Sequence, residues 1–332
     1  MKLNLNPKLL AFAFFVCIGS HPALSQFGRD SLIQLTPTIY EITGLGGNVA
    51  FKITNQCVVV VDAGVSYEAG MKIKDIIAKT TDKPIKYVIL THYHFDHTHG
   101  LAAFGNGATI ISHSNTLVNL KNDVKKMDED IQVTIPQKLI RLNHELTEFK
   151  DDAIHKIAID SAINAETTKL EELKKIKIVY PTQIYDKQWS VILGSDSIQV
   201  SYPGNGHTNG DSWVMFKNDK VIHFGDMLFT NCFPYIDALG DSKNWANQLN
   251  SVPTDDKYIY IPGHGKIAKS VDIKRFANYL IDLNKAVAGM ISQGKNLEEI
   301  RKTLSMPAYS DFGFQFLREQ NIEAVYNEQT RK

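Results

Sequence analysis

Three imidazoles and one carboxylate stand within six residues of this 332-residue chain: His92, His94, Asp96 and His97. They directly follow the apolar stretch 87–90, which has the composition of a short buried strand. Side chains of extended backbone alternate between two sides, so the first two histidines can bind one metal ion together. The aspartate and the third histidine fall on the turn, where they can face a second ion. Packed imidazoles are costly without a metal, because they repel when protonated and lose hydration.

Three more side chains able to bind a metal stand beside glycine, after or near predicted strands: His207, Asp226 and His264. Glycine lets the backbone turn sharply and brings such a side chain close to an ion. Each is a weak signal alone. Together with the first cluster they supply enough donors for two ions, each with an open position for water, as a catalytic site requires.

We therefore predict two sets of metal ligands joined by one bridging carboxylate. The sets are His92, His94 and His207 for one ion, Asp96, His97 and His264 for the other, and Asp226 between them. Asp96 and Asp226 are also the predicted catalytic residues.

Short strands and one helix must position these residues. The segment 38–63 predicts antiparallel strands, and 67–80 has the apolar spacing of a helix. Further strands are predicted at 190–193, 198–202, 212–216, 221–224 and 258–261. The pattern indicates two sheets in one domain spanning 26–332.

Two helical segments interrupt or follow the strands. An insertion at about 117–175 is rich in Lys, Asp and Glu and has no glycine; it is either a solvated helical insertion or a lid over the site. An extension at about 270–332 carries an apolar stripe at helical spacing. Its aromatic cluster predicts a surface that docks onto the core: Tyr309, Phe312, Phe314 and Phe316.

The order and spacing of the seven ligands resemble the metallo-β-lactamase superfamily, whose signature is His-x-His-x-Asp-His followed by separate His, Asp and His ligands. The resemblance extends from about residue 49 to 266. It implies an α/β fold, an αββα sandwich of two mixed sheets with the metals at one edge. It also implies that Asp62 partners the ligand histidines, and we expect Asp211 to do the same.

The residue types at two ligand positions indicate which branches of the superfamily the chain resembles. Asp226 stands where the best-known zinc β-lactamases have Cys or Ser, whereas glyoxalase II, lactonase and ribonuclease Z-like branches have Asp. His94 stands where flavodiiron relatives carry Glu. Imidazole-rich ligation favours two zinc ions per chain, with iron and manganese as open alternatives. The other histidines are predicted to be surface or core residues, with His99 the nearest to an exception: His99, His113, His144, His155 and His223.

Residues 1–25 have the tripartite plan of a secretory signal peptide, with a predicted cut before Gln26. The mature chain would then be periplasmic or secreted and retain Cys57 and Cys232, which form either one disulfide or two buried thiols. Lys plus Arg equals Asp plus Glu at 36 each, so no global field attracts nucleic acid or, after signal cleavage, a membrane. No oligomeric state is predicted.

The sequence therefore predicts an exported dinuclear metal-dependent hydrolase, which attacks a small carbonyl substrate (an ester, lactone or thioester) with a metal-bound hydroxide. A zinc β-lactamase is the alternative within enzymes. A metal-binding protein without turnover is the alternative from another class.

Overall fold

The computed structural model describes residues 30–105, 107–149, 152–252 and 254–331. The predicted signal peptide lies outside the described residues. Two compact units divide them: one combines Asp30–Leu120 with Ile178–Lys332, and the other holds Lys121–Lys177. No helix within the described ranges is long and apolar enough to cross a membrane.

The first sheet of the larger unit has seven strands in the order β1 to β7. Neighbouring strands are antiparallel from β1 to β4 and parallel from β4 to β7. Parallel strands bring their carboxyl ends to one edge of the sheet. The strands are β1 (Ser31–Gln34), β2 (Ile39–Thr43), β3 (Val49–Ile53), β4 (Val58–Val61), β5 (Ile85–Ile89), β6 (Thr109–His113) and β7 (Gln183–Tyr185).

The second sheet has five strands in the order β12-β11-β10-β9-β8. Only β11 and β12 are parallel, so the segments after both strands emerge at the same edge. The strands are β8 (Gln188–Leu193), β9 (Asp196–Ser201), β10 (Trp213–Phe216), β11 (Val221–His223) and β12 (Ile259–Ile261).

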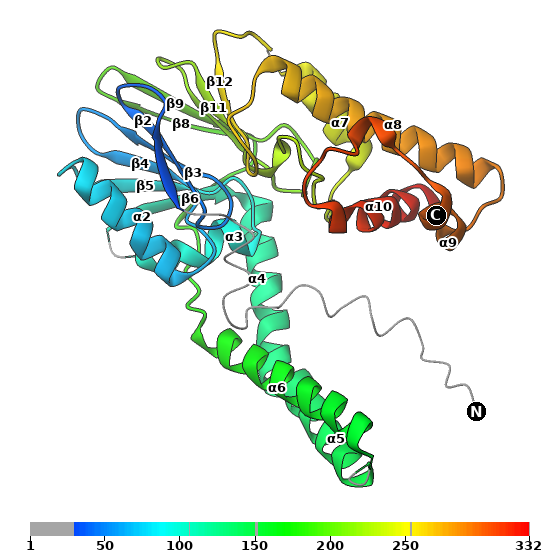
Figure 1. Ribbon diagram of the computed structural model, residues 1–332. Helices are drawn as coiled ribbons and strands as arrows, with labels where there is room; N and C mark the ends of the chain where they lie inside the picture. The colour runs from blue at the N-terminus through cyan, green and yellow to red at the C-terminus, as the bar shows by residue number, and fades with distance from the viewer. Residues whose placement is uncertain (1–29, 106, 150–151, 253, 332) are drawn as a thin grey trace. The chain divides into compact units, whose positions relative to one another are not determined.

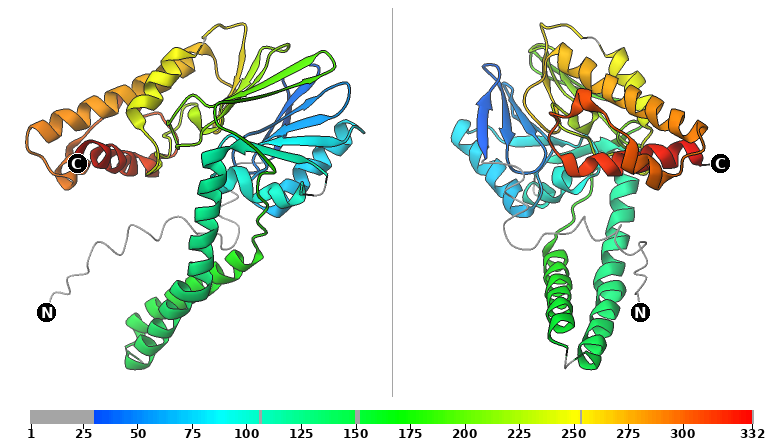
Figure 2. Two further views of the ribbon diagram at one scale, coloured as in Figure 1. Left: turned by 180° about the vertical axis from the view of Figure 1, so that it is seen from behind. Right: turned by 45° about the vertical axis from the view of Figure 1, so that its right-hand side comes forward.

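Three apolar clusters divide this unit into four layers, with the two sheets inside and helices outside (Figure 1). Val59, Val61 and Val200 lie in the cluster between the sheets. Ile73 and Ile77 of α2 pack on the first sheet, and Figure 2 shows the helices on the second sheet from two further sides. The predicted αββα sandwich is therefore confirmed. The outer helices are α2 (Tyr67–Thr80), α7 (Ser242–Ser251), α8 (Ser270–Ser292), α9 (Leu297–Thr303) and α10 (Arg318–Thr330).

Helix α2 has the bounds that its apolar spacing predicts. Ser66 caps its N-terminus by accepting a hydrogen bond from the Ala69 amide at 3.2 Å, and Glu68 adds a negative charge to the first turn. The helix connects β4 to β5 and so delivers the chain to the histidine-rich segment.

The smaller unit is the predicted helical insertion. Helix α4 (Ser114–Glu129) begins in the larger unit and continues through a π turn, Asp130–Thr134, into α5 (Ile135–Glu148), which α6 (Ala153–Lys175) follows. An ion pair joins Lys138 to Glu166 across α5 and α6, and most of the unit's side chains are exposed or half-buried. The unit thus has a thin apolar core and ion pairs on its surface.

Both cysteines are buried thiols. Cys57 lies in the cluster between the sheets, and Cys232 lies in the cluster beneath α7 and α8. The two alternatives left open by the sequence thus resolve to two thiols, because the residues belong to separate cores.

A buried ammonium group links the two sheets away from the edge described above. Lys52, near the end of β3, is 2% exposed. Its Nζ lies 2.6 Å from Asp219, between β10 and β11, and 2.9 Å from Asp196, at the start of β9. A buried charge needs such paired partners.

Glu41 predicts a measurable pH dependence of stability. This carboxyl on β2 is 1% exposed, its Oε1 has no hydrogen-bond partner among the described residues, and burial raises its pKa to about 7. A raised folded-state pKa favours folding at low pH, and this stability is lost as pH rises from about 4.5 towards 7. Glu41→Gln should therefore gain stability over the parent protein, by roughly 2 kcal/mol more at about pH 8 than at about pH 5.5. Urea unfolding of both proteins at the two pH values measures this; an unchanged difference would contradict it.

Candidate metal centre

All seven predicted ligands meet at one edge of the sandwich, where loops from both sheets converge. The first sheet supplies the run that follows β5, and the second supplies the loops after β9, β11 and β12. The residues are His92, His94, Asp96, His97, His207, Asp226 and His264.

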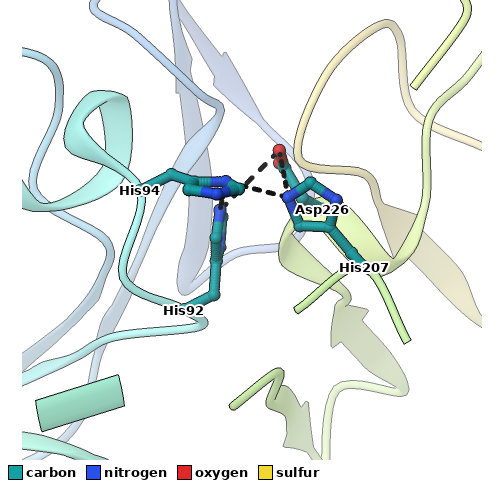
Figure 3. Close-up of side chains that lie close together, drawn as sticks. All are labelled: His92, His94, His207 and Asp226. Carbon is teal, nitrogen blue, oxygen red and sulfur yellow. Dashed lines mark hydrogen bonds and ion pairs between the residues drawn. The ribbon is translucent and has the colours of Figure 1, made fainter. Parts of the chain in front are cut away.

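Three imidazoles and one carboxylate form the first group (Figure 3). His94 Nδ1 lies 3.1 Å from His92 Nε2 and 2.9 Å from His207 Nε2. Asp226 Oδ2 lies 3.7 Å from the His92 nitrogen and 3.5 Å from the His207 nitrogen. Four potential ligand atoms thus surround one point.

The second group joins Asp96, His97 and His264. Asp96 Oδ2 lies 3.1 Å from His264 Nε2 and 3.6 Å from His97 Nε2. The other oxygen of Asp226, Oδ1, lies 3.0 Å from His97 Nε2 and 3.5 Å from His264 Nε2. Asp226 therefore directs one oxygen to each group, as a bridging carboxylate would.

Asp62 fixes one histidine in each group. Its Oδ2 accepts hydrogen bonds from His97 Nδ1 and from the Thr91 hydroxyl, both at 2.8 Å, and its Oδ1 accepts one from the Thr91 amide. Since the Thr91 proton points to Asp62, its oxygen accepts from His92 Nδ1 at 3.0 Å. Nε2 of both histidines is therefore left to face the centre. The partnership that the resemblance implied for Asp62 is present.

Asp237 fixes His94 in the opposite tautomer. Its Oδ2 accepts from His94 Nε2 at 2.9 Å and from the Tyr93 hydroxyl at 2.6 Å, which leaves His94 Nδ1 for the centre. Burial would raise the pKa of Asp237, but the His94 and Tyr93 bonds hold it well below its usual value. Sequence reasoning missed this residue. The available signal was a single acid within the apolar stretch 232–239, since buried carboxylates need partners.

The arrangement fits a pair of metal ions. His92 Nε2 and His94 Nδ1 are both lone-pair atoms in the tautomers described, yet they face each other, which is unfavourable without a cation between them. Buried His97 Nε2 and Asp226 Oδ1 lie 3.0 Å apart but are not aligned for a hydrogen bond to each other or to another described residue. Nitrogen ligands about 2.0–2.1 Å from a tetrahedral zinc ion lie roughly 3.3 Å apart. The separations given above, 2.9–3.7 Å, scatter around that value.

Burial and charge shift the pKa values of the ligand histidines in opposite directions. Burial lowers the pKa of His92 well below its usual value and that of His207 to about 3, with neighbouring imidazoles adding to the effect. Burial also opposes protonation of His97 and His264. Carboxylates, Asp226 foremost, outweigh it and raise the pKa of His264 to about 9 and that of His97 well above its usual value. The carboxylates that favour a proton on His97 and His264 would also favour a cation there, so metal binding should compete with protonation.

Two glycines leave room that the centre needs. A Cβ at Gly47 would lie 2.1 Å from His97 Cε1, and one at Gly263 would lie 1.9 Å from Asp226 Oδ1. Any larger residue would displace a ligand, so these glycines serve close approach.

Asp211 corrects one prediction. Its oxygens accept hydrogen bonds from the Thr208 amide and hydroxyl, at 2.6–3.0 Å, rather than from a ligand histidine. Burial raises the pKa of Asp211 to about 7 against the lowering effect of these bonds. Asp211 therefore holds the backbone of the loop that carries His207. It binds Thr208, the next residue, and makes no hydrogen bond to the His207 imidazole.

The remaining histidines lie outside both groups. His113 and His223 are buried and hydrogen-bond to backbone carbonyls, and His144 and His155 are exposed. His99 is half-buried with its ring 5.8 Å from Phe95, and burial lowers its pKa to about 4. Their predicted surface and core placement is confirmed.

Asp237→Asn tests the tautomer argument. The amide can present its NH₂ to His94 and so loses the fixed acceptor, and we expect zinc affinity to fall by roughly 10- to 100-fold while the fold is retained. Titration against a chromophoric chelator measures this. Tyr93→Phe, which keeps the His94 bond to Asp237, should stay within about threefold of the parent; equal losses in both variants would contradict the argument.

Comparisons with known proteins agree with this geometry. The sequence model of the metallo-beta-lactamase superfamily matches residues 42–264. The chain is 23% identical over 227 residues to a metallo-beta-lactamase type 2 from Elizabethkingia meningoseptica, an alignment that covers 68% of this chain and 70% of the relative.

Solved structures share the fold at low sequence identity. A metallo-beta-lactamase from Pontibacter korlensis superposes with a TM-score of 0.53 at 13% identity, over 76% of this chain and 99% of that one. The sec-alkylsulfatase Pisa1 from Pseudomonas sp. gives a TM-score of 0.62 at 14% identity, over 91% of this chain and half of that one.

The family match covers most of the chain and includes all seven converging residues. Members of this family are generally hydrolases. From its sequence match, its two mixed sheets with flanking helices and its cluster of histidines and aspartates, the chain belongs to the metallo-beta-lactamase superfamily.

Proposed function

We propose that this chain is an exported dinuclear zinc hydrolase that acts on a small carbonyl substrate: an ester, a lactone or a thioester. The observation that carries the proposal is a single carboxylate, Asp226, with one oxygen in each of two ligand groups. Export to the periplasm or the medium is supported by the signal-peptide pattern of residues 1–25.

One side of the centre is open to solvent. The side chains of His94, Asp96 and His264 are 11–12% exposed, whereas those of His97 and His207 are fully buried. Among the described residues, these three side chains mark the side from which a substrate carbonyl can approach.

Bound zinc would polarise the carbonyl and lower the pKa of water to near neutrality. The residues of the chain then orient the reactants. Burial raises the pKa of Asp96, but His97 and His264 outweigh burial and lower this pKa to about 2. Asp96 therefore stays a carboxylate that can accept a hydrogen bond from the attacking water. The water oxygen bonds to the carbonyl carbon, and the bond from that carbon to oxygen or sulfur breaks. The leaving atom takes a proton, which gives a carboxylic acid and an alcohol or thiol.

Beta-lactam hydrolysis is the second candidate. The similarity to a metallo-beta-lactamase type 2 favours it, while aspartate at position 226, in place of the Cys or Ser of the best-known zinc enzymes, favours the first candidate.

The test is to purify the chain from Gln26 onward, load it with zinc, count metal per chain, and assay chromogenic ester, lactone, thioester and β-lactam substrates. Two zinc ions with turnover of an ester, lactone or thioester would support the proposal. Turnover of the β-lactam alone would favour the second candidate. Full loading without any turnover would favour a metal-binding protein. His144→Gln, an exposed histidine of the smaller unit, is the matched control and should retain both metal and activity.

A further inference from the structure

We infer that an aromatic rim, formed by the C-terminal extension and the segment after Asp226, makes the enzyme select substrates that carry an aryl or medium-length alkyl group. The rim is defined as Tyr235, Phe314 and Phe316. The inference rests on the proposed hydrolase function and adds the class of substrate that this site prefers.

The rim lies beside the open side of the centre. The Phe314 ring meets the His264 ring edge to face, with centroids 5.9 Å apart. The Tyr235 ring lies 5.5 Å from His94, another of the partly exposed ligands. Phe316 lies 5.9 Å from Phe314 and is 50% exposed, so it continues the apolar surface away from the ligands.

Backbone pairing holds this part of the extension at the metal edge. The Gly313 amide donates to Asn231 O at 2.8 Å, and the Phe233 amide donates to Gly313 O at 3.0 Å. The segment that carries Phe314 is thereby tied to the chain that follows Asp226. Figure 1 shows the red and orange C-terminal part returning towards the loops at the ends of the sheets.

Phe314 adopts a backbone conformation that bulky residues rarely occupy. Its φ is 53°, in the left-handed region. Such strain costs about 1–3 kcal/mol and persists only where surrounding structure imposes it. Asp62, which fixes His92 and His97, is another of the few non-glycine residues with positive φ, at 65°. The fold thus holds Phe314 against His264 in a conformation that its sequence does not prefer.

Arg275 of α8 stabilises the segment from its outer side. Its guanidinium donates to Asn231 Oδ1 at 2.9 Å and to Asp311 Oδ1 at 2.6 Å, and it lies 4.7 Å from the Phe312 ring centroid. Tyr309 and Phe312 are buried in the core, as docking of the extension predicts. Phe314 is half-buried and packs against the same core cluster, whereas Phe316 is 50% exposed, so the docking prediction is wrong for Phe316 alone.

An apolar surface beside a polar metal centre favours a substrate that has a polar carbonyl at one end and an apolar group at the other. The carbonyl would lie among the ligands, while an aryl or alkyl group would cover Phe314 and Phe316 and remove apolar area from water. Each added methylene that becomes buried strengthens binding in the transition state.

The test compares 4-nitrophenyl hexanoate with 4-nitrophenyl acetate on the zinc-loaded enzyme. We expect the parent to favour hexanoate in kcat/KM and Phe316→Ala to reduce the hexanoate-to-acetate ratio roughly fivefold to tenfold. Ile192→Ala, which removes an apolar residue 76% exposed on β8, should leave the ratio unchanged. Phe314→Gly provides a second variant, because glycine accepts the positive φ and only the ring is lost. Calorimetric binding of the product hexanoate should weaken in both rim variants.

The outcomes separate the two proposals. Unaltered ester ratios and unaltered hexanoate binding in both rim variants would overturn the rim inference while leaving the hydrolase intact. A zinc-loaded parent that hydrolyses neither ester but binds hexanoate through Phe316 would retain the rim and overturn ester hydrolysis.

Discussion

Asp226→Ala should remove most bound metal and lower kcat/KM by on the order of 10³, while the protein still unfolds cooperatively. The reason is geometric: each ligand group would lose an oxygen that lies 3.0–3.7 Å from two of its nitrogens. Metal analysis after dialysis, steady-state kinetics and urea unfolding of the metal-free protein measure the three quantities. The unfolding free energy of the metal-free protein should change by less than about 2 kcal/mol.

Asp128→Ala is the matched control for Asp226→Ala, because Asp128 is an exposed aspartate on α4. It should keep metal content, kinetics and stability. Parent-like turnover and full metal content in Asp226→Ala would remove this residue from the centre.

Asp62→Asn should weaken zinc binding at both groups, by roughly 10- to 100-fold each, and lower the unfolding free energy by about 1–3 kcal/mol. Asparagine tolerates the positive φ at this position, so the substitution changes the side-chain chemistry and leaves the backbone unstrained. Its amide has only one acceptor oxygen, whereas Asp62 receives donors from Thr91 and His97 on both oxygens. Zinc competition titrations and denaturant unfolding are the measurements.

Thr91→Val separates the two branches of this hydrogen-bond system. It removes the hydroxyl that joins His92 to Asp62 but keeps the bond from His97. We expect one zinc ion to bind more weakly and the other to keep its affinity. If Asp62→Asn bound two zinc ions as tightly as the parent, the orienting role of Asp62 would be refuted.

The sequence predicts best where local pattern and chemistry coincide. The spacing of Ile73 and Ile77 gives α2 its bounds, and the dense run from His92 to His97 must follow a strand for its donors to share a face. The glycines beside His207, Asp226 and His264 mark sharp turns after strands. With the histidine-rich run, they identify the seven ligands that converge.

Elements without a local pattern escaped prediction. Strand β1 (Ser31–Gln34) is exposed along its whole length, so it has no alternation of buried and exposed side chains. Helix α7 (Ser242–Ser251) is short and polar, and its apolar contacts centre on Trp245. Asp237 and Phe314 owe their roles to contacts with residues far away in the chain. A single sequence does not show which distant residues are close in space.

The ligand sets also have a mechanical consequence for the sandwich. Each group takes donors from both sheets, so bound metal would crosslink the two sheets at one edge, whereas the Lys52 ion pairs link them elsewhere. Chelation should therefore let the sheets separate locally at the metal edge before global unfolding. Amide hydrogen exchange would accelerate at Asp62 and Gly263 and remain slow along the middle of β3.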